Sequence, residues 1–195
     1  MLNWGDYTHI FFQIQQDNIN TGIVPDLNTA IEIEMADTTS NTYGLFGVKT
    51  GTLATTDEGF GISLSGGNFG FFRKDTSISA IPKDNNYHVY YLSNTEAKID
   101  GVSYNFGSSS TPIGGSWPMY MFGFNHKGIS VDKTLSVKYL KIWSGNTLVR
   151  HFVPVPSGLT IGNYTTTENG MFDIVTQTFY ANDGGIGNFQ YGKVQ

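Results

Sequence analysis

The sequence has 195 residues, of which 14% are charged and 39% hydrophobic, with a formal net charge of −5 at pH 7 and a pI of about 5.2. An acidic chain lacks the basic face that a general nucleic-acid binder needs for phosphates, so nucleic acid is not an expected partner. No apolar run approaches the ~20 residues that span a bilayer, and the start MLNWGDYTHIFF has no basic region before a long apolar stretch. We therefore expect no membrane partner and no signal peptide. The absence of cysteine excludes disulfides and thiolate metal sites.

Period-2 alternation recurs along the chain between short turn sequences, which is the pattern of β-strands. In AIEIEMA (30–36), Ile31, Ile33 and Met35 fall on one face and two glutamates on the other. In chain order, the further predicted strands are 43–48, 59–65, 68–73, 86–93, 96–101, 102–106, 118–124, 136–143, 147–155 and a closing hairpin near 170–182. The Ser/Gly-rich stretch 107–118 is predicted to be a surface loop.

About a dozen short strands without a helical period predict an all-β, two-sheet antiparallel jelly-roll sandwich. The length fits one domain over residues 1–195, with an irregular segment expected at 1–16. SGN (144–146) reads as a hairpin turn in which Gly145 takes a positive φ. Phe172, Ile174, Phe179 and Phe189 are predicted to pack in the core.

Several segments in one order carry a resemblance: INTGI (19–23), NTAIEIEM (28–35), KIDG (98–101), YLKIWSGNTLVRHFVPV (139–155) and NGMFDIVTQTFYANDGGIGNF (169–189). Together they resemble the concanavalin A-like, laminin-G-like jelly-roll domains of tail and baseplate (receptor-binding) proteins of phages that infect Gram-positive bacteria. Two positions depart from the pattern, because Gln177 stands where a turn glycine is expected and His151 where an acid is expected. The aromatic residue expected before INTG is also missing.

Glu32, Glu34 and Asp37 are the only clustered acids that suggest catalysis. In a strand, Glu32 and Glu34 share a face about 6.5–7 Å apart, a separation that overlaps the ~6.5–9.5 Å of inverting glycosidases. One concanavalin-like glucanase family reads E-x-D-x-x-E, whereas this chain reads E-x-E-x-x-D. Without a strand bulge, Asp37 would point away from the other two acids. A solvated strand face is therefore the preferred interpretation, with a glycoside hydrolase as the alternative.

Aromatic side chains predict a binding surface. The resemblance implies that His88 faces the core as a hydrogen-bonded histidine, which leaves Tyr87 and Tyr91 facing outward. If Leu140 and Ile142 are core residues, then Tyr139, Lys141 and Trp143 share the opposite face. Flat rings with a polar tip suit sugar rings, provided that the two strands lie in one sheet. Filling a subunit interface is the competing explanation.

Three further candidates lie near loops. Trp117 ends the Ser/Gly-rich loop, where it either stacks on a ligand or covers the core. Asn125 and His126 lie near an expected hairpin tip and are either sugar contacts or turn residues. The loops at Asp57–Glu58 and Asn182–Asp183 could hold Ca²⁺ through oxygen ligands, but their spacing is not diagnostic, so no cofactor is expected.

The sequence contains no phosphate-binding glycine loop, HExxH motif or nucleophile elbow. We therefore expect a non-catalytic carbohydrate-binding domain rather than an enzyme. The resemblance implies a phage tail or baseplate adhesion module on the virion, acting at the bacterial surface. Its partners would be a host cell-wall polysaccharide, other tail subunits and further copies of the chain. A structural tail module without sugar binding is the remaining alternative.

Overall fold

The computed structural model describes residues 7–11, 18–37, 43–50, 59–65, 67–73, 76–105, 116–126, 129–132, 135–183 and 189–193. Strands and turns make up this part of the chain, and the described residues include no helix. None of these residues thus belongs to a helix long and apolar enough to cross a membrane.

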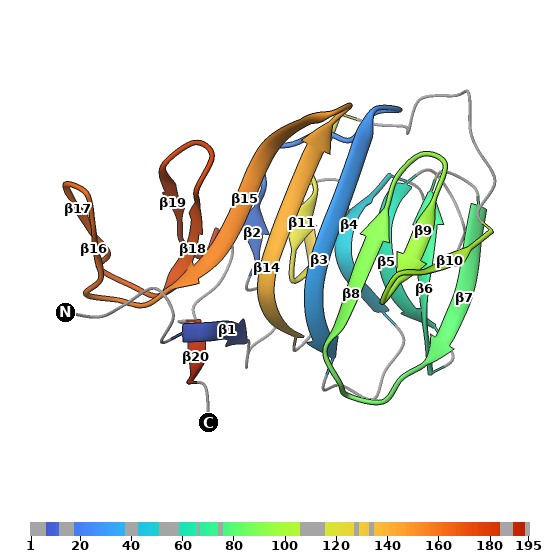
Figure 1. Ribbon diagram of the computed structural model, residues 1–195, viewed down its shortest axis with the longest axis horizontal. Helices are drawn as coiled ribbons and strands as arrows, with labels where there is room; N and C mark the ends of the chain where they lie inside the picture. Colours follow the sequence, from blue (N-terminus) through green and yellow to red (C-terminus); the bar gives the residue numbers. More distant parts are fainter. Residues whose placement is uncertain are drawn as a thin grey trace.

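The larger sheet has ten strands in the order β10-β9-β8-β3-β14-β15-β18-β19, and β1 pairs with both β14 and β20. Figure 1 shows β8, β3, β14 and β15 side by side in the near layer. The strands are β1 (Tyr7–Phe11), β3 (Thr29–Asp37), β8 (His88–Leu92), β9 (Ala97–Ile99), β10 (Val102–Tyr104), β14 (Leu135–Ser144), β15 (Thr147–Val155), β18 (Gly170–Asp173), β19 (Thr178–Tyr180) and β20 (Gln190–Lys193).

The second sheet has eight strands in the order β13-β12-β4-β5-β6-β7, with β11 pairing to β2 and β4. Its strands are β2 (Ile19–Asn20), β4 (Tyr43–Lys49), β5 (Gly59–Ser65), β6 (Asn68–Arg73), β7 (Thr76–Pro82), β11 (Tyr120–Met121), β12 (Gly123–His126) and β13 (Ile129–Asp132). The short strands β16 (Thr160–Ile161) and β17 (Tyr164–Thr165) form a separate pair.

The core lies between these two sheets. Ile31, Ile33 and Met35 of β3 have no exposed surface, as their alternation with glutamate predicts. The ring of Tyr90 on β8 meets the ring of Phe69 on β6 edge-on at 5.5 Å, which is a direct contact between the sheets. The two-sheet all-β sandwich is thus confirmed. Its strand pairs are antiparallel, except that β12 runs parallel to β4.

Two turns confirm the expected chain reversals. Gly145 joins β14 to β15 with φ +58°. Gln177 has φ +55° in the hairpin between β18 and β19, so a glutamine adopts the left-handed conformation at the position where a glycine was expected. The side-chain Nε2 of Gln177 donates to the carbonyl of Ile174 at 2.6 Å, which helps to hold this turn.

Some expectations need correction. Strand β1 lies within residues 1–16, where an irregular segment was expected. Ile174 is 40% exposed rather than part of the core, because the turn after β18 begins there. Strand β7 was not predicted, since its TSISAIP sequence is rich in small polar residues. The predicted loop at 107–118 falls mostly outside the described residues.

Candidate functional site

Strand register brings the predicted residues of β8 and β14 onto one face of the larger sheet. Strand β3 lies between these strands, so Glu32 pairs with Tyr91 on one side and with Lys141 on the other. Lys98 of β9 extends this line beyond Tyr91. His151 of β15 extends it beyond Lys141. We call this line of five side chains the polar row; it lies on the face opposite the core.

Glu32 is the centre of the polar row. One of its oxygens, Oε1, accepts hydrogen bonds from the Lys141 Nζ at 2.8 Å and from the Tyr139 hydroxyl at 3.1 Å. Partial burial, followed by the negative charge of Glu32, raises the pKa of Tyr139. Tyr139 therefore remains a protonated hydroxyl that donates to Glu32.

A β-bulge in β14 places a second ion pair beside this row. Pairing with β3 passes from Val137 opposite Met35 to Tyr139 opposite Glu34, which leaves Lys138 as the extra residue. The Nζ of Lys138 donates to Glu34 Oε1 at 2.5 Å. Both Lys138 and Tyr139 can therefore contact the outer carboxylates.

The ring faces of three tyrosines are shared with lysine ammonium groups. Lys98 lies 5.4 Å from the ring centre of Tyr91, and Lys141 lies 4.7 Å from that of Tyr139. Lys138 lies 4.3 Å from the ring centre of Tyr87. These are cation–π distances, so a ligand that stacks on such a ring must share or displace the ammonium group.

Tyr87 lies at the margin of this face, just before β8. Its hydroxyl makes a short contact with the Ser136 Oγ. Burial raises the pKa of Tyr87, with a smaller contribution from the charge of Glu34, while the Ser136 hydrogen bond acts in the opposite direction. The hydroxyl of Tyr87 is thus engaged within the protein, although its ring remains half-buried.

Trp143 lies farther along β14 on the outer face. It pairs with Ala30 of β3 and with Leu148 of β15. The methyl group of Ala30 is too short to cover an indole ring. The ring is half-buried, and it has no cation above it among the described residues. Trp143 is therefore the aromatic side chain of this face that is best placed to stack on a ligand.

The polar row ends at His151. Its imidazole meets the ring of Tyr139 edge-on at 6.5 Å. Burial, followed by the positive charge of Lys141, lowers the pKa of His151, against weaker opposing effects of Asp173 and Glu32. At neutral pH this histidine is therefore an uncharged group that can donate one hydrogen bond and accept another.

Three predicted residues lie away from this face, in or beside the smaller sheet. Trp117 precedes β11 and is 40% exposed. His126 ends β12, opposite Ile129. Asn125 has no exposed surface, and its Nδ2 donates to the Pro118 carbonyl at 2.8 Å. The prediction of Asn125 as a ligand contact is therefore wrong, because its side chain is buried and is hydrogen-bonded to the backbone within the chain.

Glu32 and Glu34, the acids of the hydrolase alternative, lie together on the outer face of β3. The bulge between the paired strands adds a residue to β14 and not to β3, so Glu32 and Glu34 share the outer face as expected. Asp37 ends β3 opposite Leu135, but its side chain lies outside the described residues. A glycosidase needs one protonated carboxyl and a second carboxylate that attacks the sugar or activates water. Here both glutamates are in contact with lysine ammonium groups instead.

His88 is a hydrogen-bonded histidine at the margin of the core, as predicted. Its side chain is 13% exposed, and its ring meets Phe69 edge-on at 6.0 Å. Nδ1 lies 2.6 Å from a carboxylate oxygen of Asp100, and Nε2 lies 3.0 Å from one of Asp84. This arrangement pins the chain before β8 to the turn between β9 and β10.

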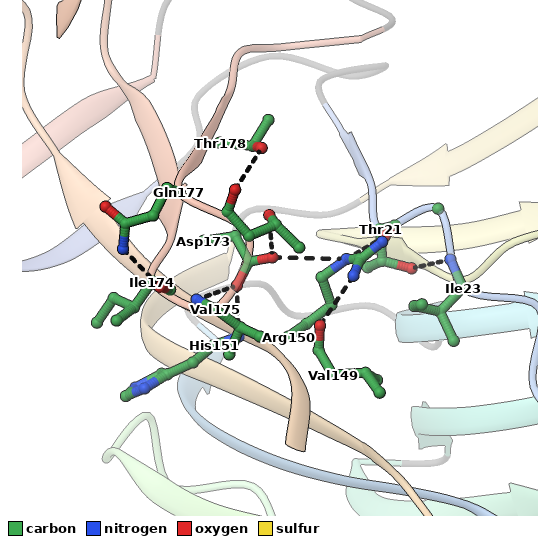
Figure 2. Close-up of polar contacts among 12 residues, drawn as sticks. Thr21, Ile23, Val149, Arg150, His151, Asp173, Ile174, Val175, Gln177 and Thr178 are labelled. Carbon is green, nitrogen blue, oxygen red and sulfur yellow. Dashed lines mark hydrogen bonds and ion pairs between the residues drawn. The ribbon is translucent and has the colours of Figure 1, made fainter. Parts of the chain in front are cut away.

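A buried ion pair that the sequence analysis missed joins β15 to the β18–β19 hairpin (Figure 2). Asp173 has no exposed surface and lies 3.6 Å from the Nε of Arg150. Its carboxylate accepts hydrogen bonds from the backbone N–H of His151 at 2.8 Å and from the Thr176 hydroxyl at 2.6 Å. The alternation around GMFD gave no sign that an acid would be enclosed. The cluster is structural, because its acceptors are satisfied from within the chain.

A groove opens at one edge of the sandwich, with a volume of about 450 Å³. We call it the edge groove; its lining residues are Asn20, Gly22, Phe179, Tyr180, Ala181, Asn182 and Asp183. Sequence reasoning missed it because residues 20–22 and 179–183 are far apart in the chain.

Among the described residues, no group of three or more histidine, aspartate or glutamate side chains is arranged to hold a metal ion. The Asp57–Glu58 loop lies outside the described part of the chain. The expectation that the chain has no cofactor therefore stays a prediction.

No protein-family model matches the sequence, and no curated protein matches it. Among solved structures, the mouse laminin alpha1 chain, domains LG4-5, is similar with a TM-score of 0.49 and 12% sequence identity. The match covers 76% of this chain and 47% of that chain, so this chain spans about half the length of the laminin structure. The assignment of the fold rests on the strand pairing described above.

Proposed function

We propose that this chain is a non-catalytic carbohydrate-binding domain that uses the outer face of β8, β3 and β14. The observation that carries the proposal is the strand register. It sets Tyr91, Glu32 and Lys141 side by side, with Tyr139 and Trp143 on the same face. Aromatic rings that alternate with carboxylate and ammonium groups offer a sugar a stacking surface together with partners for its hydroxyl groups.

The expected affinity follows from the ion pairs that this face already contains. The lysine groups above Tyr91 and Tyr139 are partly exposed donors, ion-paired with Glu96 and Glu32, that would have to turn toward ligand hydroxyls. Rearranging them has a cost, so we expect a single site to bind with a Kd of about micromolar to millimolar. Several copies on one particle would raise the apparent affinity through effective concentration.

The biological setting that we propose comes from the sequence resemblance in 139–155 and 169–189. In it the domain is a phage tail or baseplate adhesion module, carried on the virion, that recognises a cell-wall polysaccharide of a Gram-positive host. Other tail subunits and further copies of the chain are its proposed assembly partners.

The two alternatives give different results in simple assays. A hydrolase would shorten the polysaccharide, and Glu32→Gln would abolish that activity. A structural module would bind neither host cells nor wall glycans, although it would form a stable oligomer. The lysine contacts of Glu32 and Glu34 support binding rather than hydrolysis.

Aromatic variants test the proposed face. Trp143→Ala and Tyr91→Ala should each weaken adhesion of the labelled protein to Gram-positive cells and their purified wall glycans by about tenfold, which corresponds to ~1.4 kcal/mol. Trp117→Ala is the matched control, because Trp117 is exposed away from this face. Circular dichroism should show all three variants folded. If both face variants bind like wild type, or if Trp117→Ala alone loses adhesion, the face is wrongly assigned.

A further inference from the structure

The edge groove lies where the two sheets approach one another at one margin of the molecule. Its first wall follows β2, which belongs to the smaller sheet. Its second wall runs from β19, the edge strand of the larger sheet, through residues 181–183. It is thus built by different strands from those that form the proposed binding face.

The walls are fixed to one another before any ligand arrives. The backbone N–H of Asn18 donates to Asn182 Oδ1 at 3.1 Å, and the backbone N–H of Asp183 donates to the Asn18 carbonyl at 2.9 Å. In the first wall, Gly22 has φ +70°, and its N–H donates to Asn20 Oδ1 at 2.9 Å. A site held in this way loses little conformational freedom on binding.

Strand β19 alternates its side chains, so the rings of Phe179 and Tyr180 point to opposite faces of the larger sheet. Tyr180 packs against the main core, where its ring meets the buried ring of Phe152 edge-on at 5.0 Å. Phe179 packs on the other face, at 5.7 Å from Tyr164 with a tilt of 33°. Tyr180 is only partly buried, so its ring is the apolar surface that the groove offers to a ligand.

Polar groups complete the lining. Within the described residues, neither the Nδ2 of Asn20 nor the exposed carboxylate of Asp183 is hydrogen-bonded to another protein atom. One is a donor and the other a double acceptor, a combination that suits a hydroxyl-rich ligand. The nearby guanidinium of Arg150 is ion-paired with Asp173, so the net charge of the groove is negative.

The geometry points to the edge groove as a second ligand site, one that takes an uncharged sugar ring. A carboxylate can accept two neighbouring hydroxyl groups, the ring of Tyr180 can pack against the apolar face of the sugar, and Asn20 can donate to a third oxygen. The volume of about 450 Å³ falls within the ~300–1,000 Å³ of small-molecule sites. This inference rests on the proposed function only in choosing a sugar as the ligand, because the residues are different.

The test is an NMR titration of the ¹⁵N-labelled chain with the methyl glycosides of glucose, galactose, rhamnose and N-acetylglucosamine, and with methyl glucuronide as the anionic probe. At least one neutral glycoside should shift the amide signals of 20–22 and 179–183. Methyl glucuronide should bind more weakly, because Asp183 repels its carboxylate.

Asp183→Asn supplies the decisive variant. The backbone bond from Asp183 to Asn18 does not need the carboxylate, so the variant should fold while affinity falls about tenfold or more. Trp143→Ala should leave groove binding unchanged. If no neutral glycoside shifts these signals, or if Asp183→Asn binds like wild type, the groove is not a sugar site. Groove binding that persists while the β8–β3–β14 face binds nothing would overturn the proposed function and leave this inference standing.

Discussion

Asp173 is an acid enclosed at the junction of β15 and the β18–β19 hairpin. It accepts hydrogen bonds from His151, Val175 and Thr176 and forms an ion pair with Arg150. A buried carboxylate is tolerated only when its oxygens are satisfied in this way. The residue therefore holds the turn and the preceding strand in one arrangement.

Asp173→Ala should lower the free energy of unfolding by about 3 kcal/mol, because it leaves Arg150 without its carboxylate and two N–H groups without an acceptor. Urea unfolding measures this change. Glu96→Gln is the control: Glu96 pairs with Lys98 at the surface, so that variant should change stability by less than about 1 kcal/mol. A loss of under 1 kcal/mol for Asp173→Ala would show that the cluster is not structural.

His88 of β8 makes the stability of the folded chain depend on pH. Burial by itself lowers the pKa of His88, but its hydrogen bonds to Asp100 and Asp84, together with their charges, outweigh burial and raise the pKa above 6.5. The pKa of Asp84 shifts in the opposite direction. A backbone hydrogen bond from Asn86 and the contact with His88 lower the pKa of Asp84 from 3.8 to about 2.

The sign of the effect of His88 on stability follows from linkage. The folded protein binds the proton of His88 more tightly than the unfolded chain, so this stabilisation is complete below pH ~6.5 and is lost as the pH rises through the folded pKa. The difference in unfolding free energy between wild type and His88→Gln should therefore be larger near pH ~5.5 than near pH ~8.5. A difference that is constant with pH, or larger at the alkaline end, would contradict the assignment.

At the scale of the elements, glycines allow close approach within the smaller sheet. A Cβ on Gly61 of β5 would lie 2.1 Å from the Phe46 carbonyl oxygen and 2.8 Å from the ring of Phe72. Gly47 lies directly opposite on β4. Glycine inside a strand usually weakens the strand, because it has no side chain to pack. Here the backbone of β4 occupies the space that a side chain at position 61 would need.

Gly61→Ala should therefore destabilise the chain by about 2–3 kcal/mol or more, since the methyl group would force the paired backbones of β4 and β5 apart. Denaturant unfolding gives the value. Ser63→Ala, on the same strand, is the control and should stay within about 1 kcal/mol of wild type. Equal stability of the two variants would mean that the β4–β5 pairing is looser than described.

The bulge in β14 is the element-scale feature that the sequence could not reveal. Strict alternation through SVKYLKIW would put Lys138 on the same face as Leu140, yet the extra residue lets Lys138 reach Glu34 on the outer face. Bulges change register without a fixed sequence signal, whereas the alternation of AIEIEMA predicts the faces of β3 because that strand is regular.

At the scale of the whole molecule, the sequence predicted the layers better than the sites. Alternation and turn residues were enough to predict the two sheets and the hairpins at Gly145 and Gln177. Whether Tyr91 and Trp143 share a sheet depends on which strand lies between β8 and β14, and local periodicity does not contain that information. The burial of Asn125 was not predicted, because it depends on which residues of the fold pack over that side chain.

The edge groove shows the same limit more clearly. Its two walls are about 160 positions apart in the sequence, and hydrogen bonds between Asn18 and residues 182–183 join them in the folded chain. Phe179 packs against the small core cluster of Val155, Leu159 and Phe172, as predicted, but the strand pattern gave no sign that β19 would be an edge strand. Sites formed by such distant segments need the folded chain to be recognised.

The most direct test of the central claim is an NMR titration of the ¹⁵N-labelled chain with purified Gram-positive wall polysaccharide, with the polymer sized by chromatography at the end. The proposed function predicts shifts in 30–34, 89–91 and 139–143, with the polysaccharide length unchanged. No shifts at the highest polysaccharide concentration, shifts confined to other strands, or a shortened polymer would contradict it.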